Sequence, residues 1–102
     1  MHDVVYLVPV EEGVERGNIF RNPQREKARK VFATVGSVGE REFYDSAQAG
    51  YDLSLKVEVW LSDYRGEGMV VYSDEEYRIV RTYRNDKLRH MELYCERTKG
   101  RG

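Results

Sequence analysis

Alternation of apolar and polar residues dominates this chain. It is clearest over 53–59, where Leu53, Leu55, Val57 and Val59 share one side, with the period of a half-buried β-strand. Similar apolar, β-branched or aromatic runs, bounded by turn residues, indicate further strands. The strands predicted in this way cover 3–8, 26–35, 53–59, 69–72, 77–83 and 88–97.

One segment has a helical pattern instead. An S-x-x-E capping box at 37–40 precedes an apolar stripe formed by Phe43 and Ala47, which are four residues apart. Gly50 stands where a glycine commonly ends a helix. The sequence therefore predicts a short helix over 38–49, with Phe43 packed against the sheet.

Residues 10–24 show no sustained period. They hold two glycines, two asparagines and a proline, so they are predicted to form a long polar loop. Such a loop buries little apolar surface, and we expect it to be mobile in the free subunit and to become ordered on assembly. Ile19 and Phe20 are its candidate anchors, and the tail 99–102 is expected to fray.

The elements together predict one domain over 1–102, because no repeat or linker interrupts them. Consecutive short strands favour a mainly β fold, a small antiparallel barrel or meander of about five to six strands, with one short helix near 38–49. A small sheet of this kind needs closure or a partner to protect its edges.

Composition and charge narrow the functional classes. Charged residues make up 34% of the chain, yet 17 basic and 18 acidic residues nearly cancel to a net charge of −1. That balance argues against a dedicated nucleic-acid binder. Apolar runs are too short to span a membrane, and the first residues lack the basic region of a signal peptide. The single cysteine cannot form an internal disulfide, which favours a reducing compartment.

The candidate chemical groups do not assemble into a catalytic site. Cys95 is predicted to face inward as a structural thiol, and His90 falls on the opposite face as a surface histidine. The acidic run at 74–76 is interpreted as a solvated hairpin tip. One cysteine and two histidines do not supply a usual zinc site, and no phosphate-binding glycine loop is present. We therefore expect no enzyme activity, no metal and no cofactor.

Two features could serve binding. Arg25, Lys27 and Arg29 are predicted to share one strand face, where they form either a solvated outer face or a phosphate contact. The chain also holds eight tyrosines, mostly in or beside predicted strands. Tyrosine packs well in half-buried sheets, is enriched at interfaces and can stack on single-stranded bases.

Several segments, in order and spacing, resemble one known family. The first group lies around the predicted helix: 31–33, 39–44, Ala47 and Gly50. The second follows in the C-terminal strands: 63–64, 70–72, 77–83 and 91–94. Over roughly 3–97 the chain resembles the head–tail joining, or head closure, proteins of long-tailed bacteriophages.

The resemblance implies a small β-barrel-like protein that assembles as a ring, commonly of twelve copies, beneath the portal and adaptor proteins. Such a ring closes the exit channel after DNA packaging and docks the tail proteins. It implies neither catalysis nor a cofactor, and DNA would pass through without specific binding. The implied locations are the head–tail junction of the virion and, during assembly, the host cytoplasm. A nearly neutral chain is consistent with a channel along which DNA must slide.

The family motifs mark structural positions, and the residue pattern adds candidate contacts. The positions that match the family motifs and are expected to be structural are Glu42, Phe43, Tyr44, Ala47, Gly50, Tyr77, Tyr83 and Tyr94. The candidate contacts between subunits or with partners are Ile19, Phe20, Arg25, Lys27, Arg29, Tyr64 and Arg81. The alternative from a different class is a small barrel that binds single-stranded nucleic acid through tyrosine platforms and the basic strand.

Overall fold

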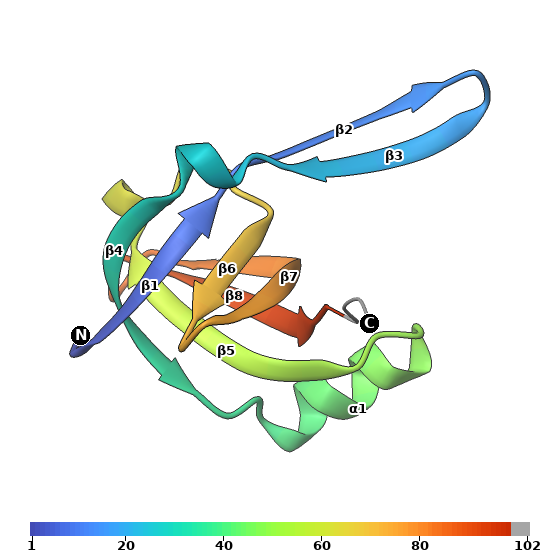
Figure 1. Ribbon diagram of the computed structural model, residues 1–102. Helices are drawn as coiled ribbons and strands as arrows, with labels where there is room; N and C mark the ends of the chain where they lie inside the picture. Colours follow the sequence, from blue (N-terminus) through green and yellow to red (C-terminus); the bar gives the residue numbers. More distant parts are fainter. Residues whose placement is uncertain (99–102) are drawn as a thin grey trace.

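A computed structural model describes residues 1–98, and the tail predicted to fray, 99–102, lies outside the described residues. Six antiparallel strands close into a barrel in the order β1-β4-β5-β8-β7-β6 (Figure 1). Their bounds are β1 Asp3–Val8, β4 Arg29–Gly36, β5 Leu53–Trp60, β6 Met69–Tyr72, β7 Glu75–Asn85 and β8 His90–Arg97. The predicted small antiparallel barrel with one short helix is confirmed.

The barrel core follows the predicted alternation. Val57 and Val59 on β5 are fully buried, as is Leu93, which pairs with Val57 across β5 and β8. β1 and β4 contribute Val5 and Ala33 to the same cluster, and each is also fully buried. Alternate residues therefore fill the interior, and their neighbours face outward.

Closure of the barrel depends on the contact between β1 and β6. Tyr6 to Val8 pair with Val71 to Met69 in antiparallel register. Each barrel strand thereby has a neighbour on both sides. The pairing on both sides is partial for some strands, because β6 pairs with only the first four residues of β7, Glu75 to Arg78.

The segment predicted as the loop 10–24 is instead a regular hairpin. Strand β2 covers Val10–Glu15 and strand β3 covers Asn18–Pro23. The turn residues Arg16 and Gly17 both have positive φ, 54° and 81°, as a two-residue type I′ turn requires. The loop prediction was wrong because arginine is uncommon in the left-handed conformation, so Arg-Gly does not stand out as a hairpin turn.

The strand predicted over 26–35 begins later than expected. A single 3-10 turn, η1, occupies Arg25–Lys27, and β4 starts at Arg29. The amide of Lys27 donates to the carbonyl of Gln24 at 2.9 Å as the chain leaves the hairpin. Arg25 and Lys27 therefore do not share a strand face with Arg29, and the predicted basic strand face does not form.

The predicted helix exists, but it presents a different face to the barrel. Helix α1 covers Glu40–Gln48, with Gly39 at its N-cap and no side-chain cap, so the capping box does not form. Phe43 is 44% exposed, and Ser46 is the helix's buried residue. The side of α1 that faces the barrel runs along Glu42 and Ser46, because Glu42 forms an ion pair with Arg81 of β7. The prediction that Phe43 packs against the sheet is wrong.

The last two connections are tight turns. Ser73 and Asp74 join β6 to β7 with positive φ angles of 53° and 65°, in a two-residue turn like that of the projecting hairpin. The strand predicted from residue 88 begins at His90, and a four-residue turn precedes it. A second 3-10 turn, η2, covers Leu61–Asp63 between β5 and β6.

Candidate functional site

The β2–β3 hairpin is the most distinctive surface feature of the molecule. It projects from one end of the barrel into solvent (Figure 1). Within residues 1–98 its two strands pair only with each other, from Val10 opposite Pro23 to Glu15 opposite Asn18. A lone two-stranded hairpin is only marginally stable in water, so a projecting one is a natural contact for a partner.

Apolar side chains lie on both faces of the hairpin. On one face Val14 and Ile19 form a cross-strand pair and are 68% and 84% exposed. On the other face the ring of Phe20 lies over Gly13, where a Cβ atom would come within 2.9 Å of Cζ. Gly13 therefore provides the space in which Phe20 crosses the hairpin. Ile19 and Phe20 were both predicted as anchors, and the structure places them on opposite faces.

The root of the hairpin is fixed to the barrel. Arg21 donates through Nη2 to the carbonyl of Gly68 at 2.9 Å and through Nε to Glu12 at 3.0 Å. The amide of Gly68 donates to the carbonyl of Val8, and a Cβ at Gly68 would meet Val10 at 3.1 Å. These contacts give the hairpin a defined direction from the barrel.

Beneath this root a buried carboxylate joins three segments. Glu67 is 4% exposed, and its Oε2 accepts from Arg29 Nε at 3.0 Å while its Oε1 accepts from the amide of Arg65 at 2.8 Å. Arg29 also donates to the carbonyl of Asp63 at 2.6 Å. Tyr64 donates to the carbonyl of Glu67, and burial, followed by the charge of Glu67, raises its pKa. Arg29 and Tyr64, both candidate partner contacts, are thus held inside the subunit.

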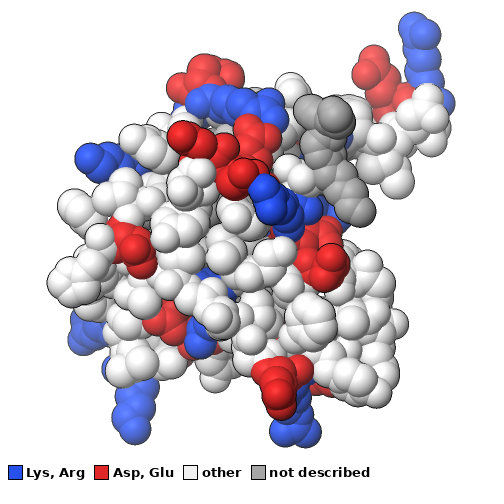
Figure 2. All heavy atoms as spheres, turned by 60° about the horizontal axis from the view of Figure 1, so that its bottom comes forward, with Lys and Arg blue, Asp and Glu red and all other residues white. Residues whose placement is uncertain are grey.

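Two of the other charged candidates also have partners within the chain. Arg25 makes a bidentate pair with Glu76, at 2.6 and 2.8 Å. Arg81 binds Glu42 and lies 5.4 Å from the centre of the Tyr94 ring. Lys27 is exposed and has no ion pair among the described residues. On the face shown in Figure 2, acidic and basic side chains are intermixed and form no continuous basic patch.

A band of polar residues crosses the outer surface of β5 and β8. Lys56 lies 3.3 Å from Glu58 and 3.9 Å from Glu92. Tyr94 donates to Glu92 at 2.8 Å, and its pKa is raised by burial first and then by that hydrogen bond. His90 is half-buried, 3.9 Å from Glu58, so the prediction of a plain surface histidine needs correction. The band holds β5 and β8 together from outside.

The motif tyrosines divide between buried and exposed positions. Tyr77 is 9% exposed and belongs to the core cluster, and Tyr94 is 8% exposed on the outer side of β8, beside Arg81. Tyr44 and Tyr83 are 64% and 53% exposed, so packing within the subunit does not account for them. Gly50, with a φ of 93°, lies just after the helix where a residue with a side chain would be strained.

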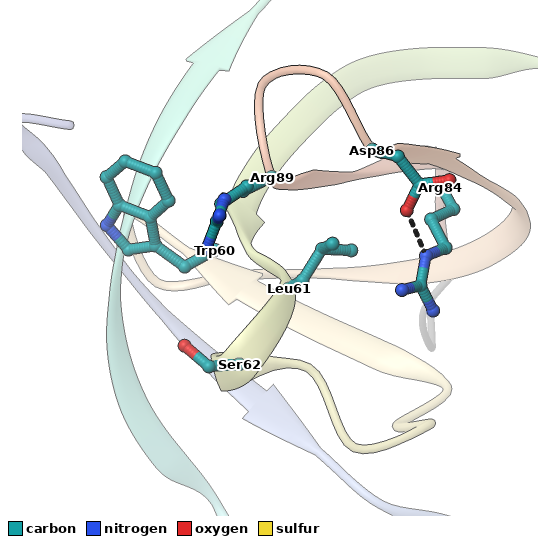
Figure 3. A pocket seen from close by; sticks show the side chains of 6 residues that line it. All are labelled: Trp60, Leu61, Ser62, Arg84, Asp86 and Arg89. Atoms are coloured by element: carbon teal, nitrogen blue, oxygen red, sulfur yellow. Dashed lines mark hydrogen bonds and ion pairs between the residues drawn. The ribbon is translucent and has the colours of Figure 1, made fainter.

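A hollow near β5 and the β7–β8 turn has no catalytic arrangement. Its lining includes Trp60, Leu61, Arg84, Asp86 and Arg89 (Figure 3). Arg84 and Asp86 form an ion pair with each other at 2.6 Å, which holds the turn. The sixth lining residue, Ser62, carries a hydroxyl, but it lies apart from Asp86, the carboxylate of the hollow (Figure 3).

Other chemically active groups are also separated from one another. Cys95 is fully buried, and burial raises the pKa of its thiol to about 12. Among the described residues no group of three His, Cys, Asp or Glu side chains could hold a metal ion. No helix in that part of the chain is long and apolar enough to cross a membrane.

Sequence reasoning missed an aromatic strip on the barrel exterior. Tyr6 is 43% exposed and Phe32 58%, on neighbouring strands, and Lys30 lies opposite Tyr6. Each aromatic residue occupies the outward position between buried neighbours in its strand. The same alternation that identified the core could have identified these two side chains as outward-facing.

Comparison with models of known protein families gives no match for this chain, and comparison with curated proteins gives none either. Function must therefore be inferred from the residues, their geometry and the resemblance carried by the sequence motifs.

Proposed function

We propose that this protein is a structural component of a phage or prophage head–tail junction. It would form a ring that closes the DNA exit channel and docks the tail. The observation that carries the proposal is the hairpin whose apolar tip, with Ile19 84% exposed, has no cover within the described subunit. The sequence motifs supply the class of assembly, and the barrel with its short helix agrees with what that class implies.

The barrel itself supports a scaffold role. Each barrel strand has a neighbour on both sides over at least part of its length, which limits the edge available for polymerisation. The connections that leave the barrel are then the natural contacts between copies. The hairpin is inserted between β1 and β4, and α1 between β4 and β5.

Helix α1 offers a second contact at the other end of the barrel from the hairpin (Figure 1). Phe43 and Tyr44 are 44% and 64% exposed there, and Ala47 is exposed beside them. A ring between head and tail needs surfaces for portal or adaptor proteins and for tail proteins in addition to its contacts between copies, and α1 offers one such surface.

The charge arrangement suits a channel through which DNA slides. Arg25, Arg29 and Arg81 are each neutralised by a carboxylate of the same subunit. Fewer basic side chains therefore remain to bind DNA phosphates. The net charge of the chain is −1. Weak phosphate binding of this kind lets DNA pass without being held.

Reconstitution with isolated portal–adaptor complexes tests the proposal. We expect electron microscopy to reveal an added ring of density at the adaptor end when the purified protein is mixed with these complexes. An Ile19→Asp variant, which charges the exposed tip, is the matched control and should add no ring. Portal–adaptor complexes that remain unchanged at saturating wild-type protein would contradict the proposal.

A second candidate is a barrel that binds single-stranded nucleic acid, favoured by the strip of Tyr6 and Phe32 beside Lys30. Each base stacked on an aromatic side chain contributes about 1–3 kcal/mol, and binding through phosphates weakens steeply with salt. Fluorescence titration of single-stranded DNA at several salt concentrations decides between the two candidates. Tight, salt-sensitive binding that Phe32→Ala removes would favour the second candidate over the first.

A further inference from the structure

The hairpin carries two strand edges that nothing in the described subunit covers. β2 and β3 pair only with each other within residues 1–98, so each has one open side. In a two-residue hairpin the residues that flank the turn exchange hydrogen bonds, here Glu15 and Asn18. Alternation then directs the backbone groups of Glu12 and Val14 outward from β2, and those of Ile19 and Arg21 outward from β3.

The two edges differ in charge. β2 holds three glutamates, Glu11, Glu12 and Glu15, and no basic residue. β3 holds Arg21 and no acidic residue. If the β2 edges of two copies paired, glutamates would face glutamates, and like charges directly opposite each other destabilise a sheet. Pairing of β3 with β2 instead brings Arg21, which already binds Glu12 of its own hairpin at 3.0 Å, beside the acidic strand of the next copy, so that one guanidinium lies between two carboxylates.

We propose that the β3 edge of one copy pairs with the β2 edge of the next copy, in a sheet that continues from subunit to subunit. The inference rests on the proposed ring-forming function and identifies its subunit contact. Hairpins that point the same way alternate in strand direction, so this pairing is antiparallel throughout. In the register of the hairpin itself, Ile19 lies opposite the partner's Val14, and Arg21 opposite the partner's Glu12.

This contact accounts for both the exposed apolar side chains and the unpaired backbone groups of the hairpin. It covers the most exposed apolar side chain among the large ones, Ile19, with the partner's Val14. It also uses the backbone groups that face away from the hairpin. Because the two edges are different surfaces, the contact is head-to-tail and can repeat until a ring closes.

Proline substitutions test the pairing with little disturbance of the hairpin. The amides of Val14 and Ile19 face outward, so Val14→Pro and Ile19→Pro each remove one donor from one edge and leave the hairpin's own bonds in place. Val14→Thr and Ile19→Thr are the matched controls, since they remove apolar surface and keep the amide. Sedimentation over a range of concentrations measures the assembly of each variant and of mixtures, and circular dichroism checks that each is folded.

We expect the wild-type chain to form higher oligomers and each proline variant alone to remain monomeric. Mixing Val14→Pro with Ile19→Pro should give a one-to-one complex that stops at two copies, because one open β3 edge meets one open β2 edge. The threonine variants should still assemble, with up to about tenfold weaker association, as expected for partial loss of apolar contact.

Three results would overturn the inference. The first is a homodimer formed by one proline variant alone, and the second is assembly of both proline variants to the same extent as the wild-type chain. The third is a wild-type chain that stays monomeric at millimolar concentration. If a proline variant loses the hairpin, the Val14→Cys and Ile19→Cys chains replace the pair. Oxidation should cross-link them only when they are mixed, because opposed strand residues lie within disulfide reach.

The same measurements separate this contact from the proposed function. Proline variants that still add a ring to portal–adaptor complexes would refute the hairpin contact and leave the function in place. A two-copy complex from the proline pair, with no ring on portal–adaptor complexes, would confirm the contact and refute the function.

Discussion

Removal of Arg29 should destabilise the fold far more than removal of an exposed arginine. Its guanidinium is the ionic partner of Glu67, whose side chain is 3% exposed. Arg29→Ala would leave that carboxylate buried with its charge uncompensated. Breaking one side of a buried pair costs about 3–5 kcal/mol, and because the Arg29 side chain is 26% exposed, water can partly replace it. We therefore expect a loss of about 3 kcal/mol.

Urea unfolding at pH 7 measures this loss, and Arg25→Ala is the matched control. The Arg25 side chain is 57% exposed in its pair with Glu76, and exposed pairs contribute about 1 kcal/mol or less. A double variant, Arg29→Met with Glu67→Met, should recover at least half of the loss, because it removes both charges together.

The comparison of the two arginines decides whether the reasoning is correct. If Arg29→Ala loses less than about 1 kcal/mol, or no more than Arg25→Ala, the buried pair does not hold the root of the hairpin.

Four other outcomes follow from the geometry. Gly13→Val should displace the Phe20 ring, because a Cβ would lie 2.9 Å from it, and nuclear magnetic resonance should show shifts confined to the hairpin. Phe43→Ala should lower the free energy of unfolding in urea by about 1 kcal/mol, since the ring is already 44% exposed. A loss above about 3 kcal/mol would place the ring in the core. Cys95, with its thiol pKa raised to about 12 by burial, should resist thiol reagents in the folded state. The neutral buried thiol contributes fully to the free energy of unfolding below about pH 8.5, and this contribution is lost as the pH rises toward 12. A larger free energy of unfolding at pH 11 than at pH 8 would contradict the raised pKa of the thiol. Amides over 11–22 should exchange faster than those of the barrel in the free protein and slow on assembly, and unchanged exchange after assembly would count against the hairpin contact.

The barrel could be predicted because its sequence carries the information locally. On β5, apolar residues alternate strictly, and Val57 and Val59 are buried as expected. Helix α1 was predicted at nearly the right place, but its orientation was not. An ion pair with Arg81, a residue distant in sequence, turns Glu42 toward the barrel and leaves Phe43 outside. Local periodicity does not contain that contact.

The candidate site was the least predictable part of the chain. Ile19 and Phe20 were identified as anchors from their apolar character, but the hairpin that carries them was not. Gly13 lowers the strand propensity of β2, although in the structure it makes room for Phe20. Arg29 was a candidate partner contact because it belongs to a basic cluster in the sequence, whereas Glu67, which neutralises it, lies far along the sequence.

These differences bear on how the molecule could assemble. Residues that looked available for partners, such as Arg29 and Arg81, are used to fix the hairpin root and α1 onto the barrel. The two insertions stay open instead, and the hairpin strands have no neighbour on their outer sides within the described residues, whereas each barrel strand has a neighbour on both sides over part of its length. Internal ion pairs therefore set the direction in which each insertion leaves the barrel, and the insertions make the contacts. A subunit built in this way can hold its open edges at a constant angle to those of its neighbours, which is the condition for a head-to-tail contact to close into a ring.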